Sequence, residues 1–174
     1  MRRWWWIPLI LSLGCDCGGS PKETVEDGSK AVEVGGYVYE AREGVVLDIP
    51  KILGRELDTL DNTALGEQLG TLRVEIQLPG KRGLERTYDS AVLRITKGRI
   101  YYIAHTFDVP IDRVLALQTM GLPGNMSALK PRSLQFRVDR PSNGIRRIAL
   151  QRAEMRSEMI TRIEVWSLLP TELN

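Results

Sequence analysis

The chain has 174 residues, of which 43% are apolar and 26% charged, with a net charge of +2, two cysteines and one histidine. A chain of this size and apolar content can bury a core, which excludes a wholly disordered protein. Two cysteines exclude a disulfide-rich scaffold, and a single histidine argues against a histidine-rich metal site. We therefore expect one globular domain with no metal and no cofactor.

The N-terminal residues differ from the rest in composition. Arg2 and Arg3 precede an apolar run, residues 4–13, that is shorter than the roughly 20 apolar residues needed to span a bilayer. This pattern predicts a signal peptide over residues 1–14. A buried first helix is the alternative, but Pro8 interrupts the run.

The segment Leu11-Ser12-Leu13-Gly14-Cys15 resembles a bacterial lipobox, with a small residue directly before the cysteine. The resemblance implies cleavage before Cys15 and lipidation of that cysteine. The protein would then be anchored to a membrane of the bacterial cell envelope by its lipid, facing the periplasm or the cell exterior. Plain secretion and an uncleaved anchor are the alternatives. Residues 15–36 are polar and punctuated by glycine, so we expect a flexible tether there and the globular domain over residues 37–174.

The first half of that domain has the pattern of helices followed by strands. Apolar spacing predicts a helix over 51–60, with Asp48 as its N-cap and Pro50 in its first turn, and a second helix over 62–69. A tight turn is expected at Lys97-Gly98. Strands are expected over 37–39, 72–78, 88–96 and 99–107.

The pattern partly recurs in the second half. A helix is expected over 111–120, and Asp108-Val109-Pro110 repeats the pattern of Asp48-Ile49-Pro50, so segments 48–107 and 108–168 are a possible duplication. Further strands are expected over 134–138, 145–151 and 159–168. The predicted fold class is α+β: an antiparallel sheet of five to six strands with two to three short helices packed on one face, in the order α-α-β-β-β then α-β-β-β.

The first unit carries a family likeness, on Ile52-Leu53-Gly54, Leu57 and the turn Lys97-Gly98-Arg99-Ile100. Two small helices before a three-stranded meander resemble the SmpA/OmlA (BamE-like) envelope lipoproteins and related lipoprotein domains of unknown function. The resemblance covers residues 47–107. It implies a noncatalytic accessory role in assembly of outer-membrane proteins.

Candidates for catalysis are few. His105 lies on a predicted strand, on the face of Tyr101, Ile103 and Phe107, and could act as a general base oriented by Asp108 or Asp112. A half-buried histidine on a sheet is the commoner case. The N-terminal carboxylates lack the spacing of a calcium loop, and we expect them to form a solvated face. We therefore assign no catalytic residue.

Charge is unevenly distributed along the chain: residues 16–67 are acidic overall and residues 71–174 are basic overall. We predict an anion- or partner-binding ridge formed by five arginines of the last strands: Arg137, Arg146, Arg147, Arg152 and Arg162. An exported protein meets little nucleic acid, so the expected partners are an envelope protein or an anionic envelope polymer. The alternative is that these arginines are solvated or pair with acids of the same molecule. We predict that Trp166 is a core residue at a strand edge rather than an interface anchor.

These observations predict a noncatalytic envelope lipoprotein that acts as a binding or scaffold module. A lipid or small-molecule carrier, or an envelope hydrolase using His105, are the alternatives.

Overall fold

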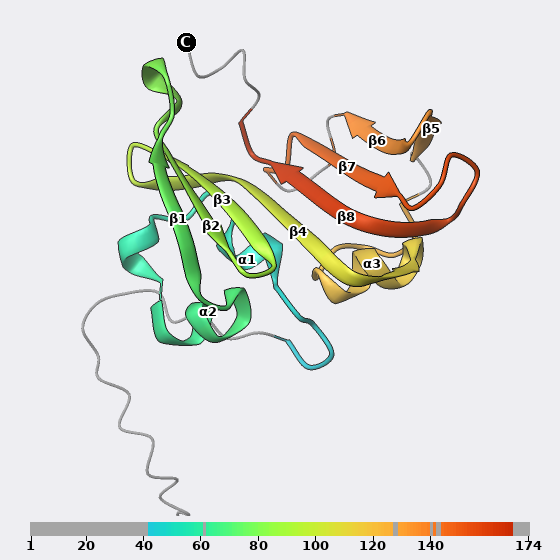
Figure 1. Ribbon diagram of the computed structural model, residues 1–174, viewed down its shortest axis with the longest axis horizontal. Helices are drawn as coiled ribbons and strands as arrows, with labels where there is room; N and C mark the ends of the chain where they lie inside the picture. Colours follow the sequence, from blue (N-terminus) through green and yellow to red (C-terminus); the bar gives the residue numbers. More distant parts are fainter. Residues whose placement is uncertain (1–41, 61, 127–128, 140, 142–143, 169–174) are drawn as a thin grey trace, which may run out of the picture. The chain divides into compact units, whose positions relative to one another are not determined.

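One antiparallel sheet organises the computed structural model, which describes residues 42–60, 62–126, 129–139, 141 and 144–168 (Figure 1). The predicted signal peptide, Cys15, the tether and the strand over 37–39 lie outside the described residues. The described residues all belong to one unit of the chain, Glu33–Asn174.

The sheet has eight strands in the order β1-β2-β3-β4-β8-β7-β6-β5. Each half of the sequence forms a four-stranded meander, and the two meanders join where β4 pairs with β8, for example Ile103 with Val165. The strands are β1 Leu72–Gln77, β2 Leu84–Tyr88, β3 Ala91–Thr96, β4 Arg99–Asp112, β5 Lys130–Arg132, β6 Gln135–Asp139, β7 Arg147–Arg152 and β8 Met159–Trp166.

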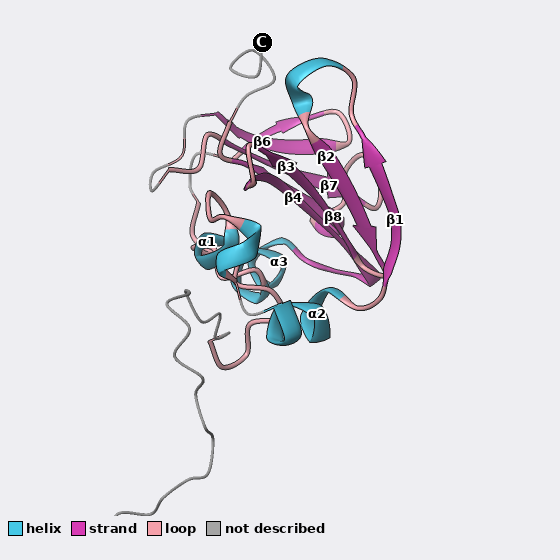
Figure 2. Ribbon diagram, turned by 90° about the vertical axis from the view of Figure 1, so that its left-hand side faces the viewer, coloured by secondary structure: helices cyan, strands magenta, loops and turns pink. Residues whose placement is uncertain are grey.

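The helices lie on one side of this sheet (Figure 2). They are α1 Ile49–Ile52, the 3-10 turn η1 Leu57–Thr59, α2 Asn62–Leu69 and α3 Arg113–Thr119, and a second 3-10 turn, η2 Gly80–Arg82, connects β1 to β2. Their apolar residues form one core with the facing side of the sheet, including Ile52, Leu69 and Leu117 against Leu93 and Ile103. Burial of these side chains is the main force that holds the two layers together.

The α+β class and the helices on one face are confirmed, but the sheet is larger than the predicted five to six strands. The residues 88–96 were expected to be one strand, whereas β2 ends at Tyr88 and β3 begins at Ala91 after a turn. The strand β5 was missed because it has only three residues, Lys-Pro-Arg, without apolar alternation.

Helix boundaries also differ from the expectation. Helix α2 occupies its predicted range, while the predicted helix over 51–60 is broken into α1 and η1. Asp112 caps α3, its Oδ1 accepting from the backbone N–H of Val114 at 2.8 Å. Asp48 was expected to cap α1 but makes no capping hydrogen bond. Its carboxylate is buried instead, and Oδ2 lies 2.7 Å from Arg42 Nε.

The two edges of the sheet differ in character. Strand β5 presents Pro131 between two basic residues. Strand β1 is exposed along its length, with Val74 at 50% exposure. Its apolar and charged residues alternate as predicted. Val74 and Ile76 nevertheless point away from the helices, because their partners Thr87 and Glu85 lie on the side of the sheet without helices. Within the described residues no helix is long and apolar enough to cross a membrane.

Candidate binding face

The side of the sheet opposite the helices is the candidate site. We call it the open face, since none of the helices in the described residues lies on it. The strand register places on it Val92, Tyr102, Ala104, Ala149, Glu164 and Trp166. A small cluster of buried apolar side chains sits at its centre, separate from the main core.

Four side chains of adjacent strands stand in register across the open face. Arg94 pairs with Tyr102, Tyr102 with Trp166, and Trp166 with Arg147. We call these four residues the cation–aromatic row. Antiparallel pairing puts directly opposite side chains on the same face about 5 Å apart, so the register itself builds the row.

The geometry of the row is that of stacked cations and rings. The guanidinium carbon of Arg94 lies 4.6 Å from the Tyr102 ring centroid, and that of Arg147 lies 4.7 Å from the Trp166 centroid. The two rings are 5.0 Å apart and tilted by 53°. Although the helices lie on the other side, Tyr102 is only 3% exposed and Trp166 8%. The arginines are therefore part of the cover over these rings.

Two cations of the open face are neutralised by neighbouring acids. Arg94 Nε lies 2.6 Å from Glu85 Oε2, and Arg162 Nε lies 2.9 Å from Glu164 Oε1. Arg162 Nη2 also reaches the Tyr102 hydroxyl at 3.4 Å. Burial raises the pKa of the Tyr102 phenol, so the ring stays neutral at physiological pH.

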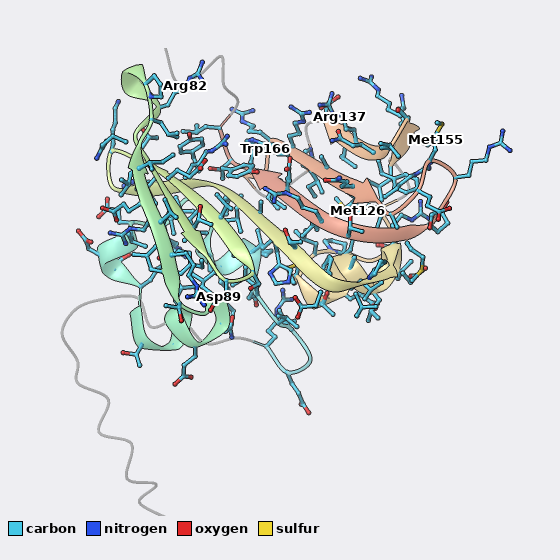
Figure 3. The ribbon with its side chains drawn as sticks, in the orientation of Figure 1. Arg82, Asp89, Met126, Arg137, Met155 and Trp166 are labelled. Atoms are coloured by element: carbon cyan, nitrogen blue, oxygen red, sulfur yellow. The ribbon has the colours of Figure 1, made fainter. Side chains whose placement is uncertain are left out.

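The other cations of this face lie over β5, β6 and β7. Arg137 and Arg147 make no ion pair with the described residues, and the Nε atom of each is shielded from solvent without a hydrogen-bond acceptor there. Next to Arg137 is a depression of about 260 Å³, lined by Lys130, Arg132, Arg137, Val138 and Asp139. Figure 3 shows Arg137 and Trp166 with their side chains. This corner of the sheet combines positive charge with unused donors.

The structure brings together three of the five arginines predicted to form a ridge. Arg137, Arg147 and Arg162 share the open face. Arg152 follows an irregularity in the register of β7 and lies on the other side, 3.9 Å from the centroid of the core residue Phe136. Arg146 precedes β7 and is exposed, its backbone N–H donating to the Trp166 carbonyl at 2.7 Å.

His105 lies on the helix-facing side of the sheet, away from the open face. It pairs with Ile163 of the core and is 6% exposed, with its ring 4.9 Å from that of Phe107. Burial lowers the pKa of its imidazole, and the Asp108 carboxylate opposes this effect. Tyr101 was expected on the same side but is extruded by a bulge in the pairing of β3 with β4.

A second hollow lies beside the helices. It has a volume of about 410 Å³, and its wall is mostly apolar, with Leu122, Met126 and Ile145 alongside Lys51. The buried Asp48 carboxylate forms part of the wall and is held by Arg42.

Sequence reasoning missed Arg94 and Tyr102 as members of the face, and it noted Lys130 and Arg132 as basic residues without assigning them to the site. The pairing of Arg94 with Tyr102 could not be predicted, because a bulge between Arg94 and Ile95 shifts the register set by the Lys97-Gly98 turn, which would place Arg94 opposite Tyr101. Lys130 and Arg132 lie on the missed strand β5. Within the described residues no group of three or more His, Cys, Asp or Glu side chains could hold a metal ion. No family model, curated protein or solved structure matches the chain.

Proposed function

We propose that the protein is a noncatalytic, lipid-anchored module of the bacterial cell envelope that binds another envelope component through the open face. Cys15 carries the anchor in this proposal, and residues 15–36 hold the domain away from the membrane surface. We also propose that the protein is related to the SmpA/OmlA lipoproteins, and the short helices followed by an antiparallel meander support this relationship.

The observation that carries the proposal is the composition of the open face. It exposes a basic corner beside a buried aromatic pair that arginines cover, and arginine, tryptophan and tyrosine are enriched at interfaces. The chemically reactive side chain His105 lies on the opposite side in the core. Binding through charge complementarity therefore accounts for the face better than catalysis does.

Site-specific photo-crosslinking in the native host tests this function. A photoreactive amino acid at Thr106, an exposed position of the open face, should capture a specific partner. The same amino acid at Asp58, an exposed position next to the helices, is the matched control. Equal capture from both positions, or capture only from Asp58, contradicts the assignment of the open face.

Metabolic labelling with palmitate tests the anchor separately. Cys15→Ala should abolish the label, while Cys17→Ala, two residues away, should retain it. Label that persists in the Cys15→Ala protein shows that the lipid is elsewhere.

The hollow beside α1 favours a second candidate function, that of a carrier for a small apolar molecule. Ligand pockets of about 300–1,000 Å³ with apolar walls and few polar groups are typical, and this hollow of about 410 Å³ fits that description. Native mass spectrometry of protein purified from its host should then show a bound apolar molecule. That molecule should be lost in Leu122→Arg, which fills the hollow.

A further inference from the structure

Four cationic residues lie on neighbouring strands at one corner of the open face, and three of them, Lys130, Arg132 and Arg137, line the depression there. Lys130 pairs directly with Arg137 across β5 and β6. Arg147 on β7 pairs with Asp139, two residues along β6 from Arg137. Diagonal neighbours of this kind lie about 7–8 Å apart at their Cα atoms, within reach of two long guanidinium side chains. Arg132 completes the group at the far edge of the same depression.

Stacking fixes the orientation of Arg147. Its guanidinium carbon is 4.7 Å from the Trp166 centroid, so one face of the planar group is used by the ring. The N–H donors of a guanidinium lie in its plane and point outward from its edge. The terminal N–H groups, unlike the shielded Nε, therefore stay available to a ligand, while the side chain loses little further freedom on binding.

Two hydrogen-bond donors at this corner lack an acceptor. The Nε atoms of Arg137 and Arg147 are both shielded from solvent, and neither has an acceptor among the described residues. A shielded donor without an acceptor is energetically unfavourable, so an acceptor supplied by a ligand would be stabilising. Arg152 has the same property, but it lies over Phe136 on the helix side, and another of its nitrogens donates to the Met155 carbonyl.

The depression that Arg137 lines, one strand away from Arg147, has the right size for a small anion. Its volume of about 260 Å³ leaves room for a phosphate group with several waters, each of which occupies about 30 Å³ in the liquid. Asp139 also lines it, and its carboxylate forms no ion pair with Arg137 or Arg147 in the described part of the chain. This single acid opposes the binding of an anion against four cations.

We propose that Arg137 and Arg147, assisted by Lys130 and Arg132, form a binding site for a phosphate group, as a monoester or diester. Tetrahedral phosphate offers several acceptor oxygens to guanidinium forks that approach from different directions. The inference rests on the proposed function, because it names the ligand class of the open face. In the envelope such a group is carried by a lipid headgroup or is free in solution.

Isothermal titration calorimetry on the full-length chain in a nonionic detergent tests the site. The titrants are inorganic phosphate, the monoester dihexanoyl phosphatidic acid, and the diester dihexanoyl phosphatidylcholine, whose choline cation offsets the charge of the phosphate and should weaken its binding. The double variant Arg137→Gln/Arg147→Gln should weaken phosphate binding by about tenfold or more, since hydrogen bonds to charged groups are worth about 1.5–3 kcal/mol. The matched control is Arg73→Gln/Arg99→Gln, which removes the same charge from two exposed arginines paired with Asp89 and Glu56.

The outcomes separate the site from general electrostatics. Asp139→Asn should tighten binding by about two- to fivefold, because it removes the one opposing charge. Tighter binding of phosphatidic acid than of inorganic phosphate identifies a lipid-borne ligand, and equal binding identifies the free anion. Equal weakening in the control variant, or no binding of either phosphate, overturns the site. If crosslinks from Thr106 persist in that case, the open face keeps its function and only the ligand class is wrong.

Discussion

The guanidinium of Arg147 lies over the indole of Trp166, at 4.7 Å from the centroid of the ring, on the face of the sheet that the helices leave uncovered. A tryptophan in that position would ordinarily lie open to water, yet it is 8% exposed. Arginine thus serves this fold in two ways, as an apolar cover for a ring and as a donor directed outward.

Removal of this cover should be measurable. Arg147→Ala should lower the free energy of unfolding by about 1 kcal/mol, because it removes the stacking contact and exposes the ring. The Trp166 indole N–H resonance, assigned by its loss in Trp166→Phe, should shift at the same time. Arg137→Ala, which has no ring contact among the described residues, serves as control and should leave both quantities nearly unchanged. An unshifted indole in Arg147→Ala contradicts the stacking.

Acid should destabilise the protein through His105. Burial holds the pKa of its imidazole below the ordinary value of about 6.5. Between the folded and the unfolded pKa, the unfolded chain binds more protons. Stability is therefore greatest above about pH 6.5 and falls as the pH falls through the folded pKa. Urea unfolding between pH 7.5 and 5 should show this loss.

The variant His105→Gln should flatten that dependence, since it has no proton to bind. Asp89 does not interfere in this range. Its pKa is lowered, chiefly by the backbone N–H of Thr71 and the Arg73 side chain, so its contribution is lost only at lower pH. An identical slope in His105→Gln would assign the acid sensitivity to another group.

The cap of α3 should contribute to stability locally. Asp112 Oδ1 accepts from the N–H groups of Val114 and Leu115 at 2.8 and 3.3 Å. Asp112→Ala should therefore cost about 1 kcal/mol, the usual value for a lost N-cap. Asp108→Ala removes an exposed acid from the same strand without removing a cap and should cost much less. Chemical denaturation of both variants provides the measurement.

Gly121 should be irreplaceable for a reason beyond its backbone angle. Its φ is +70°, and a Cβ there would lie 2.7 Å from Asp48 Oδ1 and closer still to Arg42 Nη2. Gly54 has φ +84° and nothing within 4 Å of its Cβ position. Gly54→Ala therefore reports the backbone strain alone, about 1–2 kcal/mol. Gly121→Ala should destabilise the protein further. Equal melting temperatures of the Gly121→Ala and Gly54→Ala proteins would show that the Arg42–Asp48 pair can move aside without loss of stability.

Parts of the fold with strong periodicity were predictable from sequence. Strand β1 alternates without interruption, α2 lies in its predicted range, and the Lys97-Gly98 turn joins β3 to β4 as expected, with both residues at positive φ. These elements depend on local patterns, which a single sequence displays directly.

The rest depended on tertiary contacts that no local pattern reveals. A register irregularity carries Tyr101 to the side opposite the one that simple alternation predicts, and the alternation of β7 itself separates Arg152 from Arg147. Asp48 has the sequence position of a cap, but its ion pair with Arg42 competes successfully for the carboxylate. The arginines predicted to form an anion- or partner-binding ridge include two, Arg147 and Arg152, that stack on rings contributed by other strands, which the sequence pattern did not indicate.

The joint between β4 and β8 has a consequence for how the chain folds. Every other pair of adjacent strands connects neighbours in sequence, whereas Ile103 and Val165 come together from opposite ends of the domain. Each meander can form from local contacts, so a single long loop closure completes the sheet. Residues along that one joint should therefore control the folding rate, while those in the outer hairpins should mainly control unfolding.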